Sequence, residues 1–219
     1  MRPAPIDATF VRLVVPLILS CTGYEDDVLV PSAMLLPSPP DHAVPSALII
    51  CNDSALQRWR GVIDLVGTGA HADIAAIDQV SGTDQAHRHL RIRHRVGPTT
   101  STQLFKSVLA DHAIASFDGL VDIAKGADGA NAEQLSRTLL LSPTARGDTR
   151  PQLDVHADEV KAAHGATVGQ LDADELLYLR MRGLSPASAK GLLVDGFIQE
   201  VAARLPAAAQ QAWLARSTP

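Results

Sequence analysis

Between residues 62 and 160 the chain is a series of short apolar segments separated by small and polar residues. Each segment has the length of a β-strand and is rich in leucine or β-branched residues, which favours strands. Helix-length amphipathic patterns are mostly missing between the segments, which argues against alternating strands and helices. The pattern predicts a mainly β body: a sandwich, a barrel or a solenoid of stacked coils. The expected strands are Val62–Gly67, Asp73–Val80, His89–Val96, Thr102–Leu109, Ala113–Ala124, Arg137–Ser142 and Gln152–Val160.

The turns between these segments are small and polar, which fits the stacked coils of a parallel β-helix, although no strict repeat is visible. Upstream, the prolines between Pro31 and Pro45 predict an irregular loop. This loop would separate an early strand at Val11–Leu19 from another at Ala47–Cys51. For residues 1–60 the pattern specifies nothing further.

The character of the chain changes after Gly169. Asp172 is placed to cap a helix, with Glu175 three residues later, and Gly183 is placed to end it. Ser185 and Pro186 predict the start of a second helix, and Pro206 that of a third. The second helix has an apolar stripe at Ala189, Leu193, Phe197, Val201 and Leu205, with Leu192 and Ile198 alongside. We therefore expect a β core over residues 1–170 and a helical segment over residues 171–219.

The composition excludes several classes of protein. A net charge of −5 and a single short basic run, Arg88–Arg95, give no footprint for nucleic acid. Cys21 and Cys51 are too few for a disulfide framework and too isolated for a closed zinc site, so a reducing cytoplasm is expected. No segment approaches the roughly 20 apolar residues of a membrane span.

Three further patterns offer competing interpretations. Gly67-x-Gly69-x-x-Ala72 follows an expected strand like a dinucleotide-binding turn, but that motif needs a helix immediately after it. His87 and His89 share one strand face and His94 lies on the other, so a single metal site formed by all three is not expected. Asp154, His156 and Asp158 also share a face, which is either a metal-binding ladder or a solvated polar face. No phosphate-binding lysine motif or nucleophile elbow occurs.

Several collinear blocks resemble one family. These are TSTQLFKSVLAD (100–111), SFDGLVDIAKGADG (116–129), LLLSPTARGDTRPQLDV (139–155) and HGATVGQLD (164–172). From about Gly61 to Leu205 the chain is similar to the SufB/SufD proteins of iron–sulfur cluster assembly, the SufD branch in particular, with a shortened N-terminus. The resemblance implies a right-handed parallel β-helix with a small C-terminal helical segment.

The resemblance also implies a function. The chain would be a non-enzymatic scaffold that pairs with a SufB-like protein through the end of the β-helix and binds a SufC-like ABC ATPase through its C-terminal helices. Its cargo would be iron or an iron–sulfur cluster, held transiently and shared with the partner; a flavin in the complex is left open. The alternatives are a metal-binding β-solenoid that associates with itself and, further off, a dinucleotide-binding enzyme.

Particular residues follow from the resemblance. His164 is the candidate iron or cluster ligand, since imidazole is a suitable ligand for iron. Gly165 stands where SufB proteins have glutamate, which points to the SufD branch, and Ala162 and Ala163 supply no thiolate. The residues expected near this interface are His156, Lys161 and Gly165. The expected ATPase-binding residues are Leu176, Tyr178, Leu179, Arg180, Arg182 and Gly183.

Overall fold

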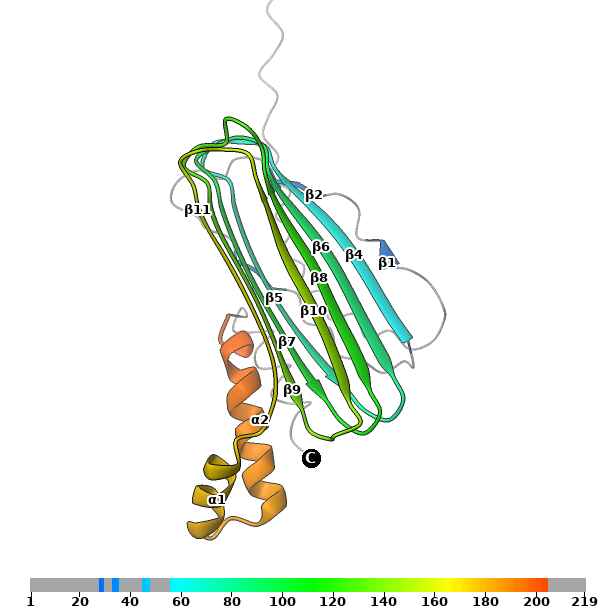
Figure 1. The fold of residues 1–219 in the computed structure, drawn as a ribbon. Coiled ribbons are helices and arrows are strands. Elements are labelled where there is room, and N and C mark those ends of the chain that lie inside the picture. Colours follow the sequence, from blue (N-terminus) through cyan, green and yellow to red (C-terminus); the bar gives the residue numbers. More distant parts are fainter. Residues whose placement is uncertain (1–27, 30–32, 36–44, 48–55, 205–219) are drawn as a thin grey trace, which may run out of the picture.

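Parallel strands follow one another along the chain and stack into a flattened solenoid, with two helices after the last strand (Figure 1). The structure, a computed structural model, describes residues 28–29, 33–35, 45–47 and 56–204. Three short strands come first: β1 Val28–Leu29, β2 Ala33–Leu35 and β3 Pro45–Ala47. The strands of ten residues are β4 Leu56–Leu65, β5 His71–Val80, β6 Gln85–His94, β7 Thr100–Leu109, β8 Ile114–Ile123, β9 Asn131–Leu140, β10 Arg146–Val155 and β11 Lys161–Gln170.

Successive long strands belong alternately to two parallel sheets. One sheet has the order β1-β4-β6-β8-β10, with β2 also paired to β4, and the other has the order β11-β9-β7-β5-β3. Gln85 of β6 pairs with Ile114 of β8, and Asn131 of β9 pairs with Lys161 of β11. One coil therefore takes roughly 30 residues, and the predicted parallel β-helix is confirmed.

Side chains alternate between the outside and the narrow lumen that the two sheets enclose, because successive residues of a strand point to opposite faces. In β6 and β8 every second residue is buried. Most of the lumen is filled by small aliphatic side chains, among them Ala72, Ile74, Leu90 and Ile92. These aliphatic residues form three clusters in the lumen, with Phe105 and Phe117 as the aromatic members.

Several polar groups that enter the lumen are paired there. Arg88 and Asp78 form a buried ion pair, with Nη2 of Arg88 2.6 Å from Oδ1 of Asp78. His94 is fully buried, and its ring nitrogens lie 2.8 Å from Oγ1 of Thr99 and 2.9 Å from Oγ of Ser101. The prediction that His94 lies on the opposite face from His87 and His89 is confirmed.

The helices begin at the predicted caps. α1 (Ala173–Met181) is capped by Asp172, which accepts hydrogen bonds from the backbone N–H groups of Asp174 and Glu175. Gly183 follows with φ of +93°, a conformation that ends a helix readily when no Cβ is present. α2 (Pro186–Ala202) is capped by Ser185.

The C-terminal half of α2 packs on the outer face of the sheet that contains β5, β7 and β9 (Figure 1). The apolar contact is made by Ile198, Val201 and Ala202 of the helix with Ala75, Ile77, Leu104, Val108 and Leu139 of the sheet. Lys106 is buried beneath the helix, where its ammonium contacts Glu200, the carbonyl oxygen of Phe197 and the Phe197 ring. The helical segment is therefore attached to the solenoid by both apolar and ionic contacts.

Some expectations do not hold. The Gly67–Gly69 turn leads directly into strand β5 rather than into a helix, so the dinucleotide-binding interpretation is wrong: no helix N-terminus is available there to hold a pyrophosphate. Leu192, expected beside the apolar stripe of α2, is exposed. Within the expected proline-rich loop, Ala33–Leu35 form strand β2.

The expected strand at Val11–Leu19, residues 48–51 and the expected helix at Pro206 lie outside the described residues. Neither helix in the described part of the chain is long and apolar enough to cross a membrane.

Candidate functional site

Within the described part of the chain, the last coil, β10 and β11, has no further strand paired to it, so a row of backbone groups lies unpaired at the end of the solenoid. The N–H of Lys161 donates to Ala130, so odd-numbered residues of β11 face β9 and even-numbered ones face the open edge. In β10 the N–H of His156 donates to Ile123, so the odd-numbered residues face the open edge there. Pro151, which has no N–H, occupies one of these positions on β10. No proline interrupts β11, so its edge can accept a further strand along its whole length.

His164 lies on this open edge strand and is exposed to solvent. Its strand partner on β9 is Gln134, whose side chain is buried in the lumen. Ala162, on the same face of β11, packs against lumen residues, whereas a Cβ on Gly165 would point outward, 3.1 Å from Cδ1 of Leu135. His164 therefore faces the mouth of the lumen, and its backbone N–H faces the unpaired edge.

The other residues expected near the interface also lie on the last coil. Lys161 begins β11 and is exposed, and His156 is exposed just after β10. Nε2 of His156 lies 3.0 Å from Oδ1 of Asp154. Together with Asp122 on β8, they offer three ligand atoms within 4.8 Å of one another, a group that could hold a metal ion. Asp158, predicted to share that face, belongs to the loop after β10 and is not part of the group.

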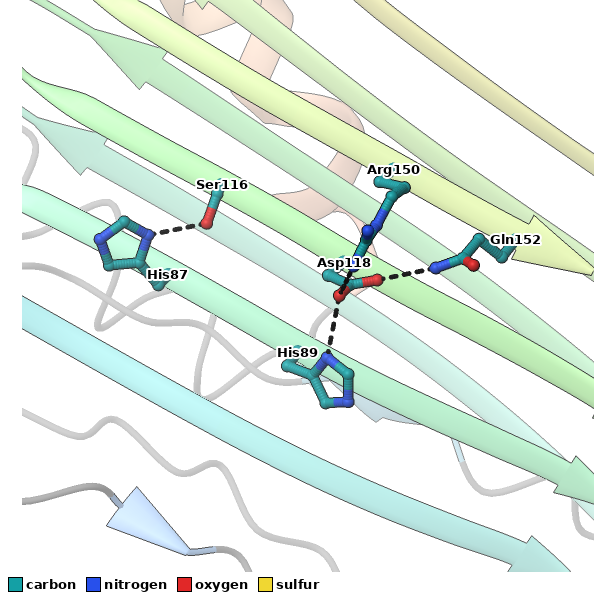
Figure 2. A network of polar contacts seen from close by, with 6 residues as sticks. All are labelled: His87, His89, Ser116, Asp118, Arg150 and Gln152. Atoms are coloured by element: carbon teal, nitrogen blue, oxygen red, sulfur yellow. Dashed lines mark hydrogen bonds and ion pairs between the residues drawn. The ribbon is translucent and has the colours of Figure 1, made fainter.

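The outer face of the β6-β8-β10 sheet carries a polar network that the sequence did not reveal (Figure 2). Asp118 on β8 accepts hydrogen bonds from Arg150 at 2.6 Å and Gln152 at 3.0 Å, and lies 3.3 Å from Nδ1 of His89. The hydrogen bond from Arg150 is the main cause of a lowered pKa of the Asp118 carboxyl. These contacts join three successive coils from outside and so connect the last coil to the two beneath it.

His87 belongs to the same face, and its Nδ1 lies 2.7 Å from Oγ of Ser116 (Figure 2). Partial burial, with smaller effects from Arg58 and Arg88, lowers the pKa of His87. With His94 in the lumen and His87 and His89 on the outer face, the three histidines of β6 do not come together.

Helix α1 presents an exposed apolar surface. Tyr178 is 56% exposed, and the guanidinium of Arg182 lies 5.1 Å from the centre of its ring. Leu177 and Met181 are also exposed, at 54% and 78%, although they were not among the expected contact residues. The expected residues Leu176 and Leu179 are half-buried, and Arg180 and Gly183 are exposed. The exposed surface of α1 therefore includes Tyr178 and Arg182 of the expected set, and its other apolar members are Leu177 and Met181 rather than Leu176 and Leu179.

The fold and site define a parallel β-solenoid protein with a histidine at the mouth of its last coil. Residues 42–197, more than half of the chain, match the family described as SUF system FeS cluster assembly, SufBD core domain. The chain belongs to this family, which confirms the resemblance seen in the sequence blocks.

Individual relatives agree with this assignment. The chain is 44% identical over 138 residues to an iron-sulfur cluster assembly SufBD family protein of Synechocystis, covering 63% of this chain and 29% of that protein. The iron-sulfur cluster assembly protein SufD of Escherichia coli is 36% identical over 110 residues (50% of this chain, 26% of the relative). SufD of Bacillus subtilis is 36% identical over 143 residues (65% and 33%). The matched region spans only about a quarter to a third of the length of these relatives.

Proposed function

We propose that the chain is a SufD-like scaffold subunit that takes part in iron–sulfur cluster assembly together with a SufB-like protein and a SufC-like ATPase. The observation that supports this most is the position of His164, an exposed imidazole on the unpaired edge strand of a SufBD core domain. The iron or cluster is cargo, held only while it is assembled.

The SufB-like partner binds at the open edge of β11. Strand addition there satisfies the free N–H and C=O groups of β11 and continues the sheet into the partner. It also brings the partner's side chains next to His164, whose own backbone N–H points to that edge. Lys161, Gly165 and His156 lie within the same interface.

The cluster site is completed by the partner. Iron–sulfur clusters are held by several thiolate or imidazole ligands, and β11 supplies His164 alone, with Ala162 and Ala163 before it. The chain therefore acts as a scaffold rather than an enzyme. The cytoplasm, where thiols remain reduced, is the fitting location.

The ATPase binds at α1. Leu177, Tyr178 and Met181 form an exposed apolar surface there, and Arg182 lies beside Tyr178. Tyrosine, methionine and arginine are enriched at protein interfaces. The docked C-terminal half of α2 connects this surface to the β7 and β9 strands, so a movement of the ATPase can act on the solenoid as a whole.

The test uses the chain mixed with SufB-like and SufC-like partners, followed by size-exclusion chromatography and measurement of bound iron. His164→Ala should leave the complex intact and lower its iron content several-fold. His112→Ala is the matched control, because His112 is an exposed histidine in the turn between β7 and β8, and it should retain iron. His156→Ala tests the competing group: loss of iron in His156→Ala but not in His164→Ala would assign the metal to the Asp122–Asp154–His156 group and refute the role of His164.

Self-association is the second candidate function, because the open edge of β11 can equally accept the same strand of another copy. Light scattering of the purified chain separates the two. A stable homodimer that does not exchange with the SufB-like partner would favour the self-associating metal-binding protein.

A further inference from the structure

Two glutamine amides form a column inside the solenoid directly beneath His164. Gln134 on β9 and Gln103 on β7 are strand partners, and each is 1% exposed. Nε2 of Gln134 donates to Oε1 of Gln103 at 3.0 Å. His164 on β11 is the next residue of the same column.

The column is incomplete at both ends. Among the described residues, neither Nε2 of Gln103 nor Oε1 of Gln134, the atom at the His164 end, has a hydrogen-bond partner, and both atoms are buried. Because the two polar atoms of a planar amide point in different directions, an Nε2 directed at β7 leaves Oε1 turned away from β7. A buried acceptor without a partner costs about 1–3 kcal/mol, so such an atom in a native fold calls for an explanation.

The fold also makes room for this amide. A Cβ on Gly119, across the lumen on β8, would lie 2.3 Å from Nε2 of Gln134. Any larger residue at position 119 would displace the side chain of Gln134. The surrounding sequence therefore allows Gln134 to keep its present position beneath the last coil.

We propose that Gln134 is a positioning residue for His164: when iron binds, Oε1 of Gln134, unpartnered among the described residues of the chain by itself, accepts the ring N–H of His164 and leaves the other ring nitrogen free for iron. Neighbouring strands lie about 4.8 Å apart, which puts an imidazole on β11 within reach of an amide on β9. Histidines that bind metals nearly always donate their second N–H to such an acceptor, which fixes the tautomer and the ring orientation. This inference rests on the proposed ligand role of His164.

The test measures the binding of Fe²⁺ to the metal-free complex with the SufB-like and SufC-like partners, as a function of pH. Gln134→Met keeps the size of the side chain and removes the acceptor, and it should weaken Fe²⁺ binding about 10- to 100-fold. Gln134→Glu keeps an acceptor and should restore binding. It should also move the pH midpoint of binding upward, because a carboxylate stabilises the protonated imidazole that competes with the metal. A purely structural role would not produce this shift.

Ser136→Ala is the matched control, since it removes another buried polar group of β9, two residues from Gln134, and leaves both glutamine amides in place. It should change Fe²⁺ binding less than about threefold. The double variant Gln103→Met/Gln134→Met removes both amides and should fold well, yet bind as weakly as Gln134→Met. Equal losses in Ser136→Ala and Gln134→Met would overturn the inference.

Different results would refute the ligand role of His164 and the positioning role of Gln134. If His164→Ala leaves Fe²⁺ binding unchanged, the ligand role itself is wrong. If His164→Ala weakens binding and Gln134→Met does not, the ligand role stands and the positioning role of Gln134 is refuted.

Discussion

At the scale of single residues, His94 couples the stability of the solenoid to pH. Its imidazole is fully buried between Thr99 and Ser101. Burial lowers its pKa from 6.5 to about 4, partly offset by the carboxylate of Asp122. In the unfolded chain the same imidazole takes up a proton near its ordinary pKa, so acid favours the unfolded state.

The chain should therefore lose stability as the pH falls through the window from 6.5 to about 4. At pH 5 the loss from His94 alone is on the order of 2 kcal/mol relative to neutral pH. Urea denaturation at neutral pH and at pH 5 measures it. His94→Leu should flatten this dependence while lowering stability at every pH, whereas His112→Ala, in an exposed turn, should leave the dependence unchanged. A wild-type stability that does not vary across the window would contradict the prediction.

The face on which each histidine lies could be predicted from the sequence, because strand alternation is a local property. The partnership of Gln103 with Gln134 could not. It depends on which residues of successive coils are in register, and the spacing between partners varies: Gln103 pairs with Gln134, whereas Gln85 pairs with Ile114. Without a repeated motif, the sequence holds no marker of that register.

At the scale of elements, the attachment of α2 depends on Lys106. This lysine is 3% exposed, and its ammonium lies 2.6 Å from Oε2 of Glu200. The hydrogen bond from Lys106 lowers the pKa of Glu200. A buried ammonium without its counter-ion is costly, whereas the half-exposed Glu200 can be solvated by water.

Removing the carboxylate of Glu200 should therefore destabilise the fold more than removing the ammonium of Lys106. We expect Glu200→Gln to lower the free energy of unfolding by about 1–3 kcal/mol and Lys106→Met by less. Guanidinium denaturation monitored by the helical circular dichroism signal measures both. Arg137→Gln, which removes only the exposed partner of Glu200, should cost below about 0.5 kcal/mol. The reverse order of Glu200→Gln and Lys106→Met would show that the ammonium is not effectively buried.

The helix boundaries were predictable because their signals are local: Asp172, Ser185 and Pro186 act within one turn of the chain. The orientation of α2 was only partly predictable. Ala189, Ile198 and Val201 are buried as expected, but Leu192, expected alongside them, is 52% exposed. Which side of a hydrophobic stripe is covered depends on the neighbouring elements, and the helix sequence does not encode their position.

At the scale of the whole molecule, the open edge of β11 should decide whether a partner binds. Ala166 directs its N–H to that edge, whereas Ala163 directs its N–H to β9. Ala166→Pro removes an edge donor without breaking the β9 ladder, so the chain should fold and fail to pair with the SufB-like protein in size-exclusion chromatography. Ala163→Pro should instead destabilise the last coil of the chain by itself. A normal complex with Ala166→Pro would rule out strand addition at this edge.

Local sequence patterns limited the fold to a mainly β architecture but did not identify which one. Alternation and turn composition predicted strands, but a sandwich, a barrel and a solenoid all satisfy them. What distinguishes the solenoid is that each ten-residue strand pairs with the strand two places away in the chain, and only the resemblance to a family carried that information. The candidate site was likewise predicted from the family resemblance, because His164 by itself does not specify which partner binds at the open edge of β11.

The one-sided pairing of the last coil has a consequence for how easily this region opens. Inner strands such as β7 and β8 are held from both sides, whereas β10 and β11 are held from one side only. Protection of backbone amides against hydrogen exchange should therefore decline along the axis towards β11. A partner that binds only when β10 and β11 are fully paired must suppress this local opening. Part of the binding free energy therefore offsets the entropy lost when these two strands are ordered. The affinity for the partner is therefore thermodynamically linked to the local stability of the last coil. A substitution that does not touch the partner can still weaken assembly if it destabilises β10 and β11.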